Sequence, residues 1–144
     1  MDYKVHAGAG SLYNTPPMYP IYICSLVLDW IAEQGGVEEM ARRATAKASA
    51  LYSAGLEASD AAKAPCVTDA AYRSKMNATF TIPDAALEKQ FFAEAKARQF
   101  LQINGHRSVG GVRVSMYNAV PLDAVNEFAA FMADFAARVH ANMN

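Results

Sequence analysis

The sequence has few of the residues that build disulfide frameworks or metal sites, with two cysteines and three histidines among 144 residues. Cys24 lies in a helix-like run and Cys66 in an expected loop, so reduced thiols are predicted instead of a disulfide. His6, His106 and His140 have no Cys, His or Asp at the spacings that zinc ligands require. No metal site is therefore predicted.

The chain also lacks an excess of charge of one sign. Thirteen Lys and Arg face fourteen Asp and Glu, for a net charge of −1, and no basic run occurs. This balance argues against nucleic acid or an anionic membrane as the main partner. No apolar stretch of the kind found in secretion signals follows the polar residues 1–4, so a cytoplasmic location is predicted. With 53% hydrophobic residues the chain can bury a core, and one domain is expected over 1–144.

What the sequence does contain is a glycine-rich segment with basic side chains, residues 105–118, which reads G-H-R-S-V-G-G-V-R-V-S-M-Y-N. Gly105, Gly110 and Gly111 permit positive φ and let main-chain N–H groups approach a ligand. His106 and Arg107 place charged donors beside them. This combination predicts an anion-binding turn.

The alternation after this turn predicts a strand. Val112, Val114 and Met116 share one face of residues 112–117, so Arg113 lies on the other face of a rigid element. A guanidinium matches a carboxylate with two parallel hydrogen bonds, and two arginines at this spacing could hold both anionic groups of one small molecule. The alternative is that Arg107 is an ordinary loop charge and that Arg113 pairs with a carboxylate of this chain.

Periodicity along the rest of the chain predicts an α+β fold, with a sheet of about three strands packed against about four helices. The first expected helix runs from Pro16 or Pro17 to Ile31 and is stopped by Gly35 and Gly36. The second has the apolar stripe Val37, Met40, Ala44, Leu51 and Tyr52, and the third is capped by Asp84 and carries Leu87, Phe91, Phe92 and Ala95. The fourth runs from Leu122 to about Ala141 with the stripe Val125, Phe128, Met132, Phe135 and Val139. The expected strands are 76–82, 100–103 and 112–117, and a loop is expected over 59–69.

The first two helices differ in how their side chains are distributed. The first is apolar almost all round, and at about fourteen residues it is too short for the roughly twenty that a membrane span requires. It is either a central core helix or a contact with a large domain or second subunit. The second helix has Glu38 and Glu39 in its first turn and Arg42 and Arg43 further on, and we expect its charges on a solvated face.

Three segments, in order along the chain, resemble motifs of one enzyme family. Residues 11–17, S-L-Y-N-T-P-P, resemble an N-T-P-P segment; residues 73–77, R-S-K-M-N, resemble R-S-x-M-N at the start of a strand; and residues 105–119 resemble a C-terminal G-H-R signature. All three are similar to motifs of the phosphoserine aminotransferases, which are pyridoxal-phosphate enzymes of fold type I. The resemblance implies the small C-terminal domain of that fold, with residues 1–17 leading in from a large domain that this chain does not contain.

The resemblance also implies roles for individual residues. In the family, the His and first Arg of G-H-R contact the substrate phosphate, and the later Arg holds the α-carboxylate; these are His106, Arg107 and Arg113. The Asn and Thr of N-T-P-P, here Asn14 and Thr15, reach the cofactor phosphate in the site of the neighbouring subunit of a homodimer. The reaction implied moves an amino group from glutamate to 3-phosphohydroxypyruvate, giving O-phosphoserine and 2-oxoglutarate for serine biosynthesis, and also serves pyridoxine biosynthesis.

One family feature is absent. The lysine that forms the Schiff base with pyridoxal 5'-phosphate (PLP), and the acidic partner of its pyridinium nitrogen, both precede the segment that this chain resembles. Six lysines are present and none matches by position or neighbours: Lys4, Lys47, Lys63, Lys75, Lys89 and Lys96. We therefore expect no catalytic residue here, no PLP bound to this chain alone, and no activity without the rest of the enzyme. The alternatives are a stand-alone anion-binding module and a purely dimerising domain.

Overall fold

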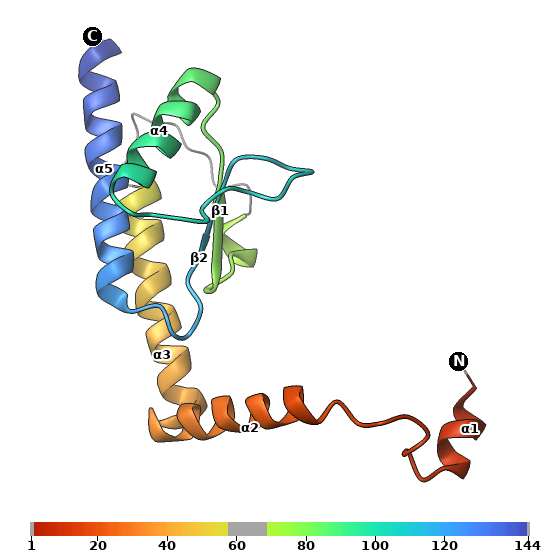
Figure 1. Cartoon of the computed structure of the whole chain (residues 1–144). Coiled ribbons are helices and arrows are strands. Elements are labelled where there is room, and N and C mark those ends of the chain that lie inside the picture. The colour runs from red at the N-terminus through yellow and green to blue at the C-terminus, as the bar shows by residue number, and fades with distance from the viewer. Residues whose placement is uncertain (1, 58–68, 144) are drawn as a thin grey trace. The chain divides into compact units, whose positions relative to one another are not determined.

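The chain divides into two units, Met1–Glu39 and Met40–Asn144, in a computed structural model that describes residues 2–57 and 69–143 (Figure 1). The expectation of one domain over 1–144 stays a prediction. The expected loop over 59–69, together with Cys66, lies outside the described residues except for Asp69. That residue caps the short 3₁₀ helix η2 (Ala70–Tyr72) by accepting a hydrogen bond from the backbone N–H of Ala71.

The first unit contains one helix that was expected and one that was not. The unexpected helix is α1 (Tyr3–Gly8), capped by Asp2, whose carboxylate accepts from the backbone N–H of Lys4 at 2.9 Å. The expected one is α2 (Met18–Glu33), which starts directly after Pro17 and ends before Gly35 and Gly36. Both glycines have positive φ, +104° and +74°, which stops a right-handed helix. The predicted start and stop of this helix are confirmed.

No residue of α2 is buried by the rest of its own unit. Eight of its large apolar side chains are exposed: Met18, Tyr19, Ile21, Tyr22, Ile23, Leu26, Val27 and Leu28. The rest of its own unit therefore does not make α2 a core helix, and both interpretations of its apolar surface stay predictions. In addition, no helix among the described residues is both long and apolar enough to cross a bilayer.

The next helix, α3 (Gly36–Ser49), continues directly into a π-helical segment, η1 (Ala50–Glu57). Of the predicted stripe, Met40, Ala44, Leu51 and Tyr52 are buried, as expected from their recurrence on one face of a helix. Val37 is the exception and is 78% exposed.

The sheet has two antiparallel strands, β1 (Asn77–Phe80) and β2 (Val112–Ser115), among the described residues, and the prediction of three strands is wrong. The missing strand was expected at 100–103. There, Gln99 and Gln102 adopt φ of +65° and +60°, which an extended strand does not permit. What remains is a single bridge between Asn104 and Val112, next to a hydrogen bond from the backbone N–H of Arg113 to the carbonyl of Ile103 at 2.8 Å.

The register gives the two faces of this sheet different roles. Phe80 pairs with Val112 and Ala78 with Val114, and all four side chains are buried. On the opposite face, Thr79 pairs with Arg113 and Asn77 with Ser115, and these residues are partly exposed. Arg113 therefore lies on the partly exposed face of the sheet, as the alternation predicted.

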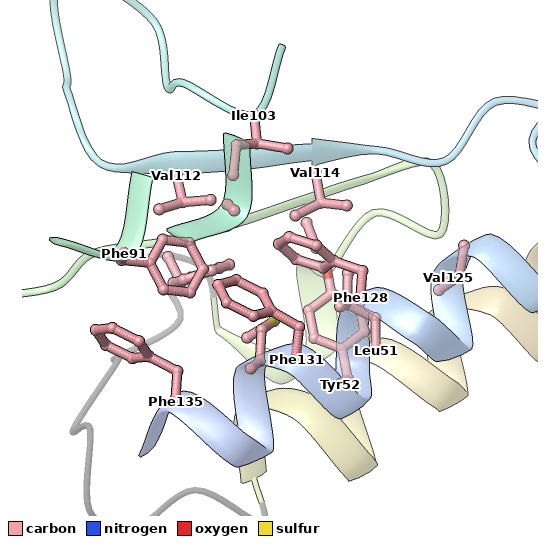
Figure 2. Close-up of a cluster of buried hydrophobic side chains, with 14 of the residues drawn as sticks. Leu51, Tyr52, Phe91, Ile103, Val112, Val114, Val125, Phe128, Phe131 and Phe135 are labelled. Atoms are coloured by element: carbon pink, nitrogen blue, oxygen red, sulfur yellow. The ribbon is translucent and has the colours of Figure 1, made fainter. Parts of the chain in front are cut away.

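Two further helices close the core on the apolar face of the sheet. Asp84 caps α4 (Ala85–Ala97) by accepting from the backbone N–H groups of Ala86 and Leu87, as predicted. The last helix, α5 (Leu122–Met143), buries its whole predicted stripe. Figure 2 shows the rings of α4 and α5 gathered below the valines of β2; those of Phe91 and Phe131 have centroids 5.1 Å apart. The α+β class is confirmed, with five α-helices among the described residues.

Candidate functional site

The predicted anion-binding turn is a closed loop at the start of β2. The backbone N–H of Gly105 donates to the carbonyl of Gly111 at 2.7 Å and closes its base. At the tip, the backbone N–H groups of Val109 and Gly110 donate to the carbonyl of His106 at 2.9 and 2.8 Å. Figure 1 shows this loop extending beyond the two strands. His106 and Arg107 are therefore carried on a hydrogen-bonded turn and not on a loose connection.

The three glycines of this loop serve two different purposes. Gly110 and Gly111 have positive φ, +75° and +70°, as predicted. Gly105 does not, and its role is close approach: a Cβ at this position would lie 1.9 Å from the Gly110 carbonyl oxygen. The base of the loop is thus too narrow for any side chain at residue 105.

His106 has one ring nitrogen engaged within the loop. Its Nδ1 lies 2.7 Å from the Oγ of Ser108 and 3.3 Å from the backbone nitrogen of Ser108. Because Nδ1 is taken up by Ser108, Nε2 is the nitrogen that can donate to a ligand. Arg107 is exposed, and its side chain makes no hydrogen bond or ion pair within residues 2–57 and 69–143.

Arg113 follows two residues after the loop, on β2. The residue is partly exposed, and its Nε is buried without a hydrogen-bond partner in the described part of the chain. No carboxylate there forms an ion pair with it, so the alternative of an internal partner finds no support. A guanidinium in this setting retains its capacity to bind an anion.

The structure thus brings His106, Arg107 and Arg113 together in one segment of the second unit. Asn14 and Thr15 lie in the first unit, in the exposed stretch between α1 and α2. Neither side chain makes a hydrogen bond among the described residues, so both are available to a phosphate group. No group of three His, Cys, Asp or Glu residues that could hold a metal ion occurs in the described ranges.

One buried cation near this site was missed by sequence reasoning. Lys47 on α3 is 2% exposed, and its Nζ donates to the carbonyls of Met116, Tyr117 and Val120 at 3.0, 2.6 and 3.0 Å. Burial lowers the pKa of Lys47, and the positive charge of Arg43 lowers it further.

The expectation of a solvated face holds for the charges it named, since Glu38 and Arg42 are exposed and Glu39 and Arg43 partly exposed, whereas Lys47 further along α3 is buried. A signal was present in the sequence, since Lys47 falls between Ala44 and Leu51 on the buried stripe, three residues from the first and four from the second.

Comparisons with known proteins give a consistent result. The aminotransferase class-V family profile matches residues 1–128. A phosphoserine aminotransferase of Geobacillus kaustophilus is 50% identical over 138 residues, which are 96% of this chain and 38% of that protein. Phosphoserine aminotransferase 2, chloroplastic, of Arabidopsis thaliana is 46% identical over 138 residues, or 96% of this chain and 32% of that protein.

Comparison with solved structures points to the same family. Phosphoserine aminotransferase from Bacillus circulans subsp. alkalophilus superposes with a TM-score of 0.82 at 38% identity, over 94% of this chain and 37% of that one. The PLP-bound enzyme of Trichomonas vaginalis gives a TM-score of 0.75 at 32% identity, over 91% of this chain and 37% of that one. The chain thus spans between about a third and two fifths of the length of these proteins.

Proposed function

This chain belongs to the aminotransferase class-V family, and from that premise we propose that it is the C-terminal part of a PLP-dependent phosphoserine aminotransferase. The complete enzyme would transfer an amino group from glutamate to 3-phosphohydroxypyruvate, giving O-phosphoserine and 2-oxoglutarate in serine and pyridoxine biosynthesis. The predicted cytoplasmic location stays a prediction, and the Arabidopsis relatives are named as chloroplastic.

The observation that carries this proposal is that the basic side chains of the loop and β2 have no carboxylate partner in the described ranges. Three basic side chains occur there within eight residues of sequence. A phosphorylated α-keto or α-amino acid carries a phosphate and a carboxylate, so it offers one partner to His106 and Arg107 and one to Arg113. Charged hydrogen bonds of this kind contribute about 1.5–3 kcal/mol each when partly desolvated.

Each residue has a distinct part in the proposed site. Nε2 of His106 and the guanidinium of Arg107 bind the substrate phosphate. Arg113 binds the α-carboxylate and so orients the carbon that gains or loses the amino group. Asn14 and Thr15 bind the cofactor phosphate in the site of the other subunit.

PLP, when bound, supplies the electron sink on which amino-group transfer depends. None of the six lysines of the sequence matches the family's cofactor lysine by position or neighbours, so we expect the chain to contribute substrate binding and to show no transaminase activity by itself. The exposed apolar α2 favours a covering surface in the complete protein, either its large domain or the second subunit of a homodimer.

Arg113→Ala in the complete enzyme tests the proposal. Loss of one charged hydrogen-bonding group predicts that kcat/KM falls about 10- to 100-fold for both O-phosphoserine and glutamate, because both carry an α-carboxylate. Arg98→Ala is the matched control, since the Arg98 side chain pairs with Asp134 at 2.9 Å on the surface and should leave kcat/KM unchanged. Unchanged kcat/KM in the Arg113 variant would remove Arg113 from the site.

A further inference from the structure

We propose that Lys47 is a positioning residue for the substrate carboxylate site: it holds the backbone that leaves β2 and thereby fixes the place of Arg113. This inference rests on the proposed function, because it assigns Lys47 to the site in which Arg113 binds the carboxylate. Lys47 itself does not contact the substrate.

The hydrogen bonds of Lys47 are saturated. An ammonium group has three protons to donate, and three backbone carbonyls accept from it, those of Met116, Tyr117 and Val120. No carboxylate among the described residues pairs with it. Lys47 therefore supplies the hydrogen-bond donors for the backbone that turns between β2 and α5. Because all three of its protons are donated in this way, it is not a free amine nucleophile.

These carbonyls belong to the segment between β2 and α5. Met116 is fully buried and continues the strand pairing, because its backbone N–H donates to the carbonyl of Met76 at 2.7 Å. The backbone N–H of Val120 donates to the carbonyl of Tyr117 at 2.9 Å, so the chain turns here toward α5. Without the ammonium, all three carbonyls would lose this donor, which favours a different path for the segment.

Such a change would be transmitted to Arg113 because β2 is short and held at its two ends. It has four residues and a single full partner strand, an arrangement that is marginal by itself. Its first end is fastened by the bond from Arg113 N–H to the Ile103 carbonyl, and its last end by Lys47. The side chain of Arg113 has no described partner that could hold it instead.

The experiment uses the complete enzyme with Lys47→Met, which keeps the length of the side chain and removes the donors. Lys75→Met is the matched control, since Lys75 is an exposed lysine whose Nζ, within the described ranges, donates only to the hydroxyl of Thr45 on α3, at 3.0 Å. We expect the KM for O-phosphoserine to rise about 10-fold in the Lys47 variant with a much smaller change in kcat, and no change in the control.

A double-mutant cycle with Arg113→Ala separates positioning from a general loss of stability. If Lys47 acts through Arg113, adding Lys47→Met to Arg113→Ala should raise KM no further. A Lys47→Met enzyme with a lower Tm but a KM within twofold of wild type overturns the inference, as does a full additional rise in KM in the double variant.

Two outcomes separate this inference from the proposed function. If Arg113→Ala alone leaves KM and kcat unchanged, the proposed function fails; if Arg113→Ala weakens the enzyme and Lys47→Met does not, only the positioning role fails. Should Lys47→Met not fold, Lys47→Gln replaces it in the same cycle. Its shorter amide retains two of the three N–H donors, so a smaller rise in KM is expected, with no further rise when it is combined with Arg113→Ala.

Discussion

Gly105→Ala is the substitution that most directly tests the loop at the candidate site. The added Cβ would lie 1.9 Å from the carbonyl oxygen of Gly110, 2.7 Å from its carbon and 2.9 Å from the carbonyl oxygen of Gly111. These are backbone atoms of the facing segment, so no flexible side chain can yield. To reach the 3.4 Å at which ordinary contact begins, the first pair must separate by a further 1.5 Å, the difference between 3.4 and 1.9.

That separation acts on the proposed phosphate site. It would break the 2.7 Å hydrogen bond from Gly105 N–H to the Gly111 carbonyl and displace His106, the next residue. Overpacking of this kind costs about 1–3 kcal/mol of folding free energy. Loss of one charged hydrogen bond to the phosphate, at about 1.5–3 kcal/mol, corresponds to a fall of about 10- to 100-fold in kcat/KM.

The assay is kcat/KM for O-phosphoserine in the complete enzyme, with Gly110→Ala as the matched control in the same loop. A Cβ at Gly110 meets nothing within 4 Å, although φ there is +75°. The control should therefore lose about 1–2 kcal/mol of stability from its left-handed backbone while the base of the loop keeps its spacing. If both variants retain the same kcat/KM to within twofold, the narrow base of the loop has no bearing on substrate binding.

Two predictions concern stability. Phe91→Ala should lower the free energy of unfolding by about 3–5 kcal/mol in urea titrations, because Phe91 is 2% exposed and its ring contacts those of Phe131 and Phe135. Phe92→Ala, at a partly exposed position, should lower it clearly less, and equal losses would contradict this account. The hydrogen bond from Arg138 lowers the pKa of Glu94, so this ion pair stabilises the fold above the ordinary pKa of a glutamate and ceases to do so as the pH falls through the lower folded pKa. The free energy of unfolding measured against pH should show this loss in the wild type. Persistence of the same loss in Glu94→Gln would refute the assignment.

Local features of the sequence determined most of the helices. Pro17 and the two glycines after residue 34 set the ends of α2, and Asp84 sets the start of α4, because capping and positive φ act within a few residues. The apolar stripe of α5 was readable because the period of a helix decides which side chains share a face. The alternation in 112–117 placed Arg113 on the face opposite the core for the same kind of reason.

The candidate site was only partly accessible to sequence reasoning. The loop was predicted, with positive φ found at Gly110 and Gly111 but not at Gly105, and the three basic residues named from the sequence lie on that loop and on β2. Their roles in binding, like those of Asn14 and Thr15, stay predictions. The glycine-rich composition did not show that Gly105 is needed for close approach, because that depends on which backbone lies opposite.

The tertiary structure alone decided three points. The apolar run at 100–103 is not a strand, since Gln99 and Gln102 turn the backbone and leave one bridge to β2. The carbonyls that accept hydrogen bonds from Lys47 lie about seventy residues further along the chain, a partnership that no local pattern encodes. The apolar α2 is not buried within its own unit, although its composition equally suited a core helix. Each depends on contacts between residues distant in sequence, whereas propensity, capping and periodicity describe only neighbours along the chain.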